Sequence, residues 1–471
     1  MRLLERFFTH ETPQIAWDGE DIVAGVLRRR VAGGARWLRG RGLRPGDHVG
    51  LHLPHGAAAP LLLLACWSAG LVVVPLDLGR PTDQLRRLLK RSKARLLITS
   101  GKKGANLARH GPIESLVLDK AWTLPVAQTA TAPELEVELS PDAPALILWT
   151  SGSTGTPKGV SITRGAIDDF VEHWTERLGI GPTDRVAWTA ALSFDLSLLD
   201  LGVALSSGAT LVPVPEERLA FPEELGAWLT EQQVTCLYTV PSLLERALPA
   251  DKPLPASLRV ILSAGEALPV SLARRLRAAL PAEGLLGNLF GPTETNVSVA
   301  WFAPPGWAGD AVPIGAPCPY AKVRLTDEGE LLVAGSTVMT GYWGEPDRAQ
   351  WSDLDGDRWL HTGDLARWEG DELHFLGRAD RMLKIRGYRV EPENVEGALA
   401  LVPGVLEAAV IVRDSDDGPV LVGFVAGDVD PVAVRKAVSA TLPGWAVPEH
   451  IEVVDALPRS TRGKVDRAAL S

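Results

Sequence analysis

The sequence predicts an α/β fold: a large N-terminal domain of two doubly wound subdomains plus a small β-barrel, followed by a small α+β C-terminal domain. Three observations predict it. Between residues 20 and 300, short apolar runs alternate with amphipathic helical stretches, as in βαβ units with mostly parallel sheets. Residues 310–376 are short strands separated by Gly, Asp and Pro turns, which indicates an antiparallel barrel or sheet. After Gly377, helices and strands mix again over about 90 residues, the size of a small domain.

Each element follows from a local pattern. In the N-terminal part the apolar runs predict strands at 48–53, 71–75, 95–99, 146–149, 185–189, 210–213, 236–238 and 259–262, with helices at 225–232 and 271–279. The barrel segment predicts strands at 322–325, 330–333 and 373–375. The last segment predicts strands at 406–412, 420–425 and 451–454 and helices at 393–401 and 431–442.

Bulk properties exclude several classes of function. A chain of 471 residues suggests roughly two to four folding units. Its formal net charge of −10 argues against a nucleic-acid or anionic-membrane partner. Cys66, Cys236 and Cys318 lie far apart, so a structural zinc site is not expected, and so few thiols fit a reducing, cytoplasmic location.

The N-terminus lacks the apolar region of a signal peptide, and the one transmembrane candidate is residues 57–78. Pro60, Gly70 and Pro75 divide that segment, which favours a buried helix followed by a buried strand.

The segment TSGSTGTPKG at 150–159 is the strongest functional signal, because it follows the apolar run 145–149 and so leaves a sheet edge as a glycine-rich loop. Glycines free backbone N–H groups to form an anion-binding nest. Hydroxyls and a lysine add donors for a polyphosphate: Thr150, Ser151, Ser153, Thr154, Thr156 and Lys158. The loop is not a P-loop, since Pro157 precedes the lysine. The alternative is an ordinary surface loop.

Further segments follow in a fixed order: WSAGLVVVPLD (67–77), SFDLS (193–197), FGPTET (290–295), GELLVAGSTVMTGYWG (329–344), HTGD (361–364), GRADRMLKIRGYRVE (377–391) and PRSTRGKVDR (458–467). With the glycine-rich loop they resemble, over nearly the whole chain, the adenylate-forming superfamily of acyl-CoA ligases, luciferases and the adenylation domains of nonribosomal peptide synthesis. The resemblance implies an enzyme that uses ATP and Mg²⁺.

Residue chemistry fits the roles that the resemblance implies around the nucleotide. Thr293 offers a hydroxyl to the α-phosphate, and Glu294 offers a carboxylate to Mg²⁺, a hard ion that prefers oxygen. Phe290 would stack on adenine beside Gly291, and Asn288 would read the adenine amino group. The alternative for Phe290 is core packing.

The remaining polar roles also come from the resemblance. Asp364 and Arg378 would hold the ribose, unless Asp364 only stabilises its turn. Lys464 resembles the catalytic lysine that bridges the substrate carboxylate and the α-phosphate. Asp380 resembles the hinge between an adenylation core, residues 1–379, and a mobile C-terminal domain, residues 380–471. In a second orientation Gly387 would line the tunnel for the phosphopantetheine arm of a carrier protein.

Asp195 points to the substrate class. It resembles the aspartate that pairs with the α-ammonium group in the amino-acid-activating members of the superfamily, and a buried carboxylate is costly without such a cationic partner. The alternative is an N-cap or turn aspartate. The other positions that match the family's specificity pocket carry no charge and several bulky aliphatic groups: Phe194, Leu196, Leu199, Tyr238, Leu262, Ala264, Leu289, Val297 and Ser298.

This set resembles the pocket of stand-alone prolyl-AMP ligases, which load L-proline onto a discrete peptidyl carrier protein, often for antibiotic biosynthesis. Ser298 departs from the usual cysteine and leaves open azetidine carboxylate, hydroxyproline or pipecolate. The nearest rival is an acyl- or aryl-CoA ligase of the same fold, against which Asp195 argues. A rival of another class is an ATP-binding protein without turnover, against which Glu294 and Lys464 argue.

Overall fold

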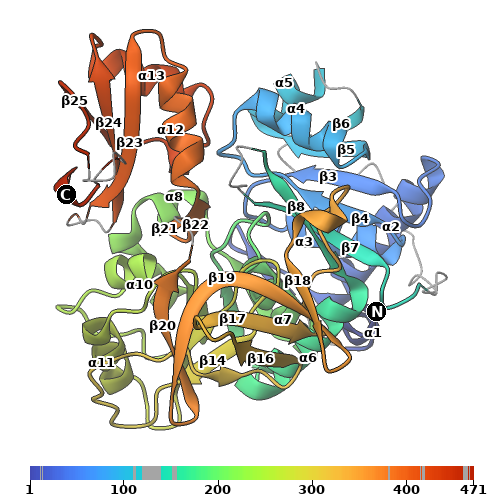
Figure 1. The fold of residues 1–471 in the computed structure, drawn as a ribbon. Helices are drawn as coiled ribbons and strands as arrows, with labels where there is room; N and C mark the ends of the chain where they lie inside the picture. Colours follow the sequence, from blue (N-terminus) through green and yellow to red (C-terminus); the bar gives the residue numbers. More distant parts are fainter. Residues whose placement is uncertain are drawn as a thin grey trace.

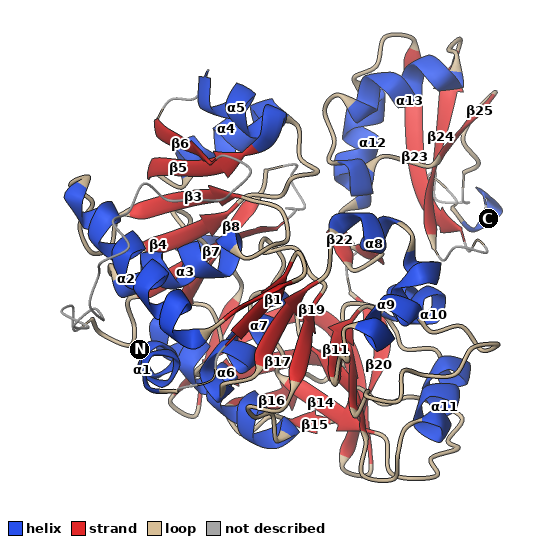
Figure 2. Cartoon of the chain, turned by 180° about the vertical axis from the view of Figure 1, so that it is seen from behind, coloured by secondary structure: helices blue, strands red, loops and turns tan. Residues whose placement is uncertain are grey.

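The computed structural model describes residues 1–10, 12, 14–109, 113–118, 139–150, 156–379, 382–413, 415, 419–459, 465 and 467–470. It confirms the predicted fold class, a large α/β part followed by a small α+β domain at the C-terminal end, with a small antiparallel sheet where the barrel was predicted (Figure 1). Figure 2 shows the same arrangement from behind, with the strands of the large part running through its interior.

The first large sheet has six strands in the order β6-β5-β3-β4-β7-β8. All neighbours are parallel except β7 and β8. The strands are β3 (His48–His52), β4 (Val72–Pro75), β5 (Ala94–Ser100), β6 (Glu114–Leu118), β7 (Pro144–Thr150) and β8 (Lys158–Thr163). Helix α2 (Ala24–Gly40) precedes β3, and the helices between successive strands are α3 (Ala58–Ser68), α4 (Thr82–Arg91) and α5 (Gly101–Arg109).

Residues 57–78 form a buried helix and a buried strand, as predicted: every residue of α3 is buried, and β4 follows it. Across the described ranges, no helix combines the length and the apolar character needed to span a bilayer.

The second large sheet has nine strands in the order β15-β14-β13-β12-β11-β9-β10-β1-β2. Its centre is parallel and its edges are antiparallel. Its strands are β1 (Gln14–Trp17), β2 (Glu20–Ile22), β9 (Arg185–Trp188), β10 (Thr210–Pro213), β11 (Cys236–Thr239), β12 (Val260–Ser263), β13 (Leu285–Phe290), β14 (Val299–Phe302) and β15 (Ala316–Pro317). The accompanying helices are α1 (Arg2–Thr9), α6 (Arg164–Leu178), α7 (Ser197–Ser207), α8 (Glu216–Ala220), α9 (Leu225–Glu231), α10 (Pro241–Ala247) and α11 (Val270–Ala279).

The barrel segment is a five-stranded antiparallel sheet of β16 (Ala321–Leu325), β17 (Glu330–Gly335), β18 (Trp351–Leu354), β19 (Asp357–Glu369) and β20 (Glu372–Arg378). The register of β19 and β20 pairs Asp364 with Arg378. Two residues from consecutive motifs are therefore placed opposite each other by the pairing of adjacent strands.

The C-terminal domain consists of the sheet β23 (Val405–Arg413), β24 (Val420–Gly427) and β25 (His450–Val454), covered by α12 (Pro392–Ala400) and α13 (Pro431–Ser439). It is preceded by a hairpin of β21 (Leu383–Ile385) and β22 (Tyr388–Val390). Positive φ angles at Arg386 (49°) and Gly387 (80°) suit the tight type I′ turn of a two-residue hairpin loop.

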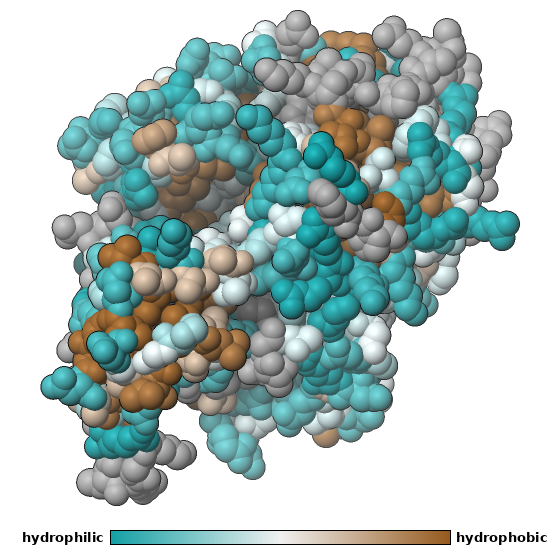
Figure 3. Space-filling model, turned by 90° about the horizontal axis from the view of Figure 1, so that it is seen from above, coloured by the Kyte–Doolittle hydropathy of each residue, from teal (hydrophilic) through white to brown (hydrophobic). Residues whose placement is uncertain are grey.

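Seen from above, brown apolar residues gather on the lobe at the lower left, where the C-terminal domain lies (Figure 3). Among the described residues, the three most exposed large apolar side chains belong to this domain: Leu401, Leu406 and Val432.

Candidate active site

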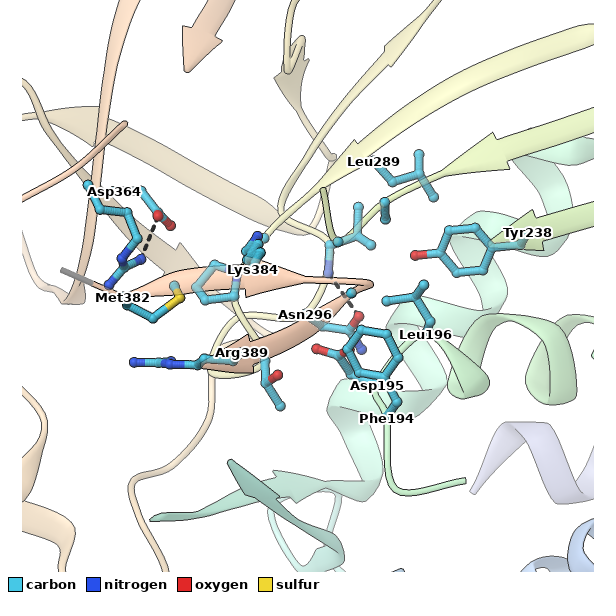
Figure 4. A pocket seen from close by; sticks show the side chains of 18 residues that line it. Phe194, Asp195, Leu196, Tyr238, Leu289, Asn296, Asp364, Met382, Lys384 and Arg389 are labelled. Atoms are coloured by element: carbon cyan, nitrogen blue, oxygen red, sulfur yellow. Dashed lines mark hydrogen bonds and ion pairs between the residues drawn. The ribbon is translucent and has the colours of Figure 1, made fainter. Parts of the chain in front are cut away.

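A cavity lies where the carboxyl ends of β11, β12 and β13 meet the β21–β22 hairpin (Figure 4). Ligands of open parallel sheets bind at this edge. Its walls combine residues of the large N-terminal part with residues in and just before the β21–β22 hairpin: Phe194, Asp195, Leu196, Tyr238, Ala264, Gly265, Leu289, Gly291, Pro292, Thr293, Asn296, Val297, Asp364, Arg378, Met382, Lys384, Gly387 and Arg389.

Asp195 is the acidic group at the substrate end of this cavity and is only 7% exposed. Burial raises the pKa of its carboxyl, although a hydrogen bond from Thr293 and the charge of Lys384 oppose that shift. Helix α7 starts at Ser197 and has Leu196 at its N-cap, so Asp195 is not the cap of that helix. The carboxylate therefore faces a cavity, where a cation could bind it.

The wall around Asp195 is apolar. Of the predicted pocket residues, Phe194, Leu196, Tyr238, Ala264, Leu289 and Val297 line the cavity. Leu199, Leu262 and Ser298 are completely buried and are not part of the lining. Leu199 and Leu262 belong to the same core cluster as the lining residues, so they set the shape of the cavity indirectly.

Two buried hydroxyls accompany this wall. Tyr238 Oη and Ser298 Oγ have no hydrogen-bond partner in the described part of the chain. Figure 4 shows the Tyr238 oxygen turned toward the cavity. Burial raises the pKa of Tyr238 well above its ordinary value, so its hydroxyl stays protonated and can donate.

At the opposite end of the cavity, Asp364 and Arg378 form a buried pair with 2.5 Å between Arg378 Nη1 and Asp364 Oδ1. The Thr362 hydroxyl accepts a hydrogen bond from the Asp364 backbone N–H at 3.1 Å. Burial raises the pKa of Asp364, and the charges of Arg378 and Lys384 counteract part of that rise. A carboxylate with a fixed guanidinium beside it suits a ligand that carries hydroxyl groups.

Two residues at the end of β13 that were predicted to bind the nucleotide do not line the cavity. Leu289 and Gly291 line the cavity, whereas Phe290 and Asn288 do not. The amide of Asn288 donates to the Pro313 carbonyl at 2.9 Å. The Phe290 ring lies 5.4 Å from the Phe375 ring and 5.3 Å from the Lys384 ammonium, both measured to the Phe290 centroid.

Gly291 is required by its surroundings. A Cβ atom at this position would lie 1.8 Å from the Asn296 carbonyl oxygen. Asn296 itself has a φ of 56°, a left-handed conformation that asparagine tolerates better than most residues. The loop that carries Thr293 and Glu294 is thus closed tightly on itself.

Glu294 is a buried carboxylate in a polar network. Its Oε1 accepts hydrogen bonds from the Tyr342 hydroxyl at 2.7 Å and from Arg389 Nη1 at 2.9 Å. Burial alone would raise the pKa of Glu294, but Arg389, Tyr342 and Lys158 together hold it below its ordinary value. Burial also lowers the pKa of Lys158, and Arg389 adds to that shift.

An ionised, oriented carboxylate fits Mg²⁺ bound mainly through substrate phosphates, since this ion commonly takes only one or two protein carboxylates. Within the described residues, no group of three or more His, Cys, Asp or Glu side chains gathers into a separate metal site. The donor set around Glu294 therefore suits a metal ion that arrives with the nucleotide.

The β21–β22 hairpin supplies side chains that the sequence motifs did not single out. Lys384 and Arg389 project from it into the cavity, with Met382 just before it (Figure 4). Burial lowers the pKa of Lys384, and the nearby charges of Asp364 and Asp195 oppose this. The Gly387 N–H donates to Glu266 Oε1 at 2.8 Å, which fixes the tip of the hairpin against the N-terminal part.

An aromatic stack continues from the cavity to the C-terminal domain. The rings of Phe194 and Tyr388 are 6.1 Å apart and 14° from parallel, and those of Tyr388 and Trp445 are 5.0 Å apart and 6° from parallel. The Trp445 indole donates to Asp77 Oδ2 at 3.0 Å, and the Arg80 guanidinium lies 5.6 Å from its ring. This stack fixes the orientation of the small domain in the structure.

A second cavity adjoins the first and shares Phe194, Thr293 and Arg389 with it. Thr150, at the end of β7, lines this second cavity beside Ser193. Ser151, Ser153 and Thr154 of the glycine-rich loop lie outside the described residues, as do Asp380 and Lys464.

Asp200, on helix α7, gives a stability prediction. It is completely buried, and burial raises the pKa of its carboxyl well above 3.8. The folded carboxyl therefore keeps its proton where the unfolded one loses it, so stability falls as pH rises above about 4. We expect Asp200→Asn to remove this fall, measured by denaturant unfolding between about pH 4 and pH 7.

Asp184→Asn is the control of opposite sign. Burial opposes the shift, but hydrogen bonds from Arg259 and Thr235 lower the pKa of Asp184. Its stabilising contribution is present above the unfolded pKa and is lost as pH falls through the folded one. An Asp200→Asn variant that keeps the parent's pH dependence would contradict the assignment.

Known proteins similar to this chain are AMP-binding enzymes, which agrees with the nucleotide-binding role expected of the site. The family model described as AMP-binding enzyme matches residues 9–343, and the model of its C-terminal domain matches residues 394–464. A dimodular nonribosomal peptide synthase of Bacillus subtilis (strain 168) is 33% identical over 457 residues, covering 93% of this chain and 19% of that protein. An L-proline–[L-prolyl-carrier protein] ligase of Pseudomonas fluorescens is 34% identical over 473 residues, covering 95% and 93% of the two chains.

A solved structure of an adenylation protein has the same fold over the whole chain. PA1221, a nonribosomal peptide synthetase protein containing adenylation and PCP domains, superposes with a TM-score of 0.85 at 25% identity, covering 100% of this chain and 83% of that one. The chain spans 19% to 34% of the length of three of the multidomain curated relatives that it matches.

Proposed function

The chain belongs to the AMP-binding enzyme family, and from this premise we propose that it is an AMP-forming ligase that activates an amino acid, most specifically L-proline, and loads it onto a discrete carrier protein. The similarity to a ligase that acts on L-proline and a carrier protein supports this proposal.

The observation that carries the proposal is Asp195, a buried carboxylate at the apolar end of the cavity. A carboxylate in such surroundings is costly unless a cation compensates it. The α-ammonium group of an amino acid supplies that cation, and the apolar wall disfavours a charged side chain. A compact aliphatic ring suits this wall, as part of proline does.

In the proposed first step the substrate carboxylate attacks the α-phosphorus of ATP, an aminoacyl-AMP forms, and pyrophosphate leaves. Asp195 orients the amino group, and Thr293 donates toward the α-phosphate. Asp364 and Arg378 hold the ribose. Glu294 would hold Mg²⁺, which neutralises phosphate charge when it is bound. Thr150, Ser151, Ser153, Thr154 and Lys158 would bind the departing phosphates, and Lys464 would bridge the reacting groups.

In the proposed second step the thiol of the carrier's phosphopantetheine arm attacks the acyl carbon, and AMP leaves. Gly387 at the tip of the docked hairpin has no side chain to obstruct the arm. The docked hairpin supports the view that this domain orientation serves the second step, with Asp380 as the hinge between the two orientations.

Pyrophosphate exchange tests the substrate. Each common amino and imino acid, together with azetidine carboxylate, hydroxyproline and pipecolate, is supplied with ATP, Mg²⁺ and labelled pyrophosphate. We expect exchange with L-proline to exceed that with every other acid. Exchange supported only by benzoate or short fatty acids would refute an amino-acid substrate.

Trp445→Ala tests the second step. The change removes the stack on Tyr388 and the hydrogen bond to Asp77, each worth about 0.5–3 kcal/mol. We expect single-turnover loading of the carrier to fall about tenfold to a hundredfold, with a smaller fall in pyrophosphate exchange. Trp368→Ala, at a partly exposed tryptophan of the barrel, is the matched control. Equal losses in both assays would contradict a role in domain orientation.

A further inference from the structure

The negative charge of Glu294 is compensated by Arg389, which lies on the other side of the domain boundary. Arg389 Nη1 lies 2.9 Å from Oε1 and 3.2 Å from Oε2 of Glu294, so the guanidinium contacts both carboxylate oxygens. Glu294 belongs to the loop after β13, whereas Arg389 belongs to β22. The ion pair therefore exists only while the hairpin is docked.

Arg389 and a metal ion compete for the same oxygens. Mg²⁺ requires oxygen ligands at about 2.0–2.1 Å in octahedral geometry and usually keeps several waters. A guanidinium in contact with both oxygens of Glu294 takes up acceptor positions that such a shell would use. The two cations also repel each other, and Lys158 adds a third positive charge near this site.

Arg389 also contacts a second carboxylate, which would remain its partner after it leaves Glu294. Its Nε lies 3.3 Å from Oε1 of Glu391, a buried carboxylate two residues further along the same chain segment. Glu391 moves with the hairpin, so the guanidinium keeps a counter-ion when Glu294 is occupied by a metal.

We propose that Arg389 is a positioning residue that exchanges with Mg²⁺ on Glu294, so that departure of the metal with pyrophosphate allows the hairpin to dock. The inference rests on the proposed function, in which Glu294 holds Mg²⁺. It adds a mechanism by which the ligand state of one carboxylate selects the orientation of a whole domain.

Disulfide trapping in the full-length protein measures docking without a turnover assay. The Gln84 amide contacts the Thr441 carbonyl across the domain boundary, so a Gln84→Cys, Thr441→Cys pair should cross-link when the hairpin is docked. Cys66, Cys236 and Cys318 are buried and free, and burial raises the pKa of each thiol, so they should not react. The readout is the rate of cross-linking on a non-reducing gel.

We expect rapid cross-linking of the double-cysteine parent without ligand. Mg²⁺ with a non-hydrolysable ATP analogue should slow it at least about tenfold, and EDTA should reverse part of this effect. Arg389→Gln should slow cross-linking about tenfold without ligand and remove the metal-dependent part, whereas Arg389→Lys should restore both in part.

Arg386→Gln is the matched control, because Arg386 lies on the same hairpin and its ion pair among the described residues is an exposed one with Glu449. It should cross-link like the parent. The inference is overturned if Arg389→Gln, shown to be folded by its melting curve, cross-links at the parent's rate with the same response to Mg²⁺. Pyrophosphate exchange by the parent is measured separately. If the parent exchanges pyrophosphate but Arg389→Gln does not change cross-linking, this inference alone is overturned. If the parent exchanges pyrophosphate with no acid, the proposed function is overturned.

Discussion

Replacing Asp195 by asparagine is expected to lower kcat/KM for the amino acid in pyrophosphate exchange by about thirtyfold to several thousandfold. Asparagine keeps the size of the side chain but removes the charge that faces the ammonium group. Loss of one partner of a buried, hydrogen-bonded charge pair costs about 2–5 kcal/mol. The loss should appear in the dependence on amino acid and much less in that on ATP, because Asp195 lies away from Asp364, the partner of Arg378 (Figure 4).

The pH dependence provides an independent check on Asp195. Burial raises the pKa of its carboxyl, although Thr293 and Lys384 oppose this. The ammonium group binds the ionised form, so kcat/KM should fall as pH drops through that raised pKa. The Asp195→Asn variant should lack this limb of the profile. Asp200→Asn is the matched control, since Asp200 is a buried aspartate on the helix that follows Asp195 and does not line the cavity.

Replacing Lys464 by alanine is expected to lower pyrophosphate exchange by about 10²–10³-fold, which is the effect of removing one preorganised group that stabilises developing charge. The melting temperature should not change. The carrier should still be loaded from synthetic aminoacyl-AMP, because the proposed second step uses the hairpin around Gly387 and not Lys464.

The two half-reactions make the Lys464 result decisive. A variant that exchanges pyrophosphate at the parent's rate would show that the lysine is misassigned. A variant that loses both exchange and loading from aminoacyl-AMP would show that the two steps do not use separate faces of the C-terminal domain. Arg459→Ala, in the same terminal segment, is the control for a general loss of positive charge.

Many helices and strands could be predicted because local sequence patterns determine them. The strand predicted at 210–213 is β10 (Thr210–Pro213), and the helix and strand predicted within 57–78 are α3 and β4. Apolar runs bounded by turn residues define such elements without knowledge of their neighbours. The antiparallel pairing of β7 with β8 was not predicted, because pairing depends on register between segments.

The site residues also fall into those that motifs identify and those that only tertiary contacts reveal. Asp195, Asp364 and Arg378 were identified from motifs, and the structure brings them to one cavity. The roles of Arg389 and Trp445 could not be predicted, since each depends on a partner in the other part of the chain. Leu199, Leu262 and Ser298 match specificity positions in the sequence, yet only packing in three dimensions shows that they lie outside the lining.

The close approach of Gly291 to the Asn296 carbonyl has a consequence for how this enzyme can diversify. Selection for new acids can act on the walls formed by separate strands, where one side chain changes at a time. The ring of backbone between Gly291 and Asn296 offers no such freedom, because even a methyl group would break its closure. Libraries screened for altered substrates should therefore return a varied wall around an unchanged glycine.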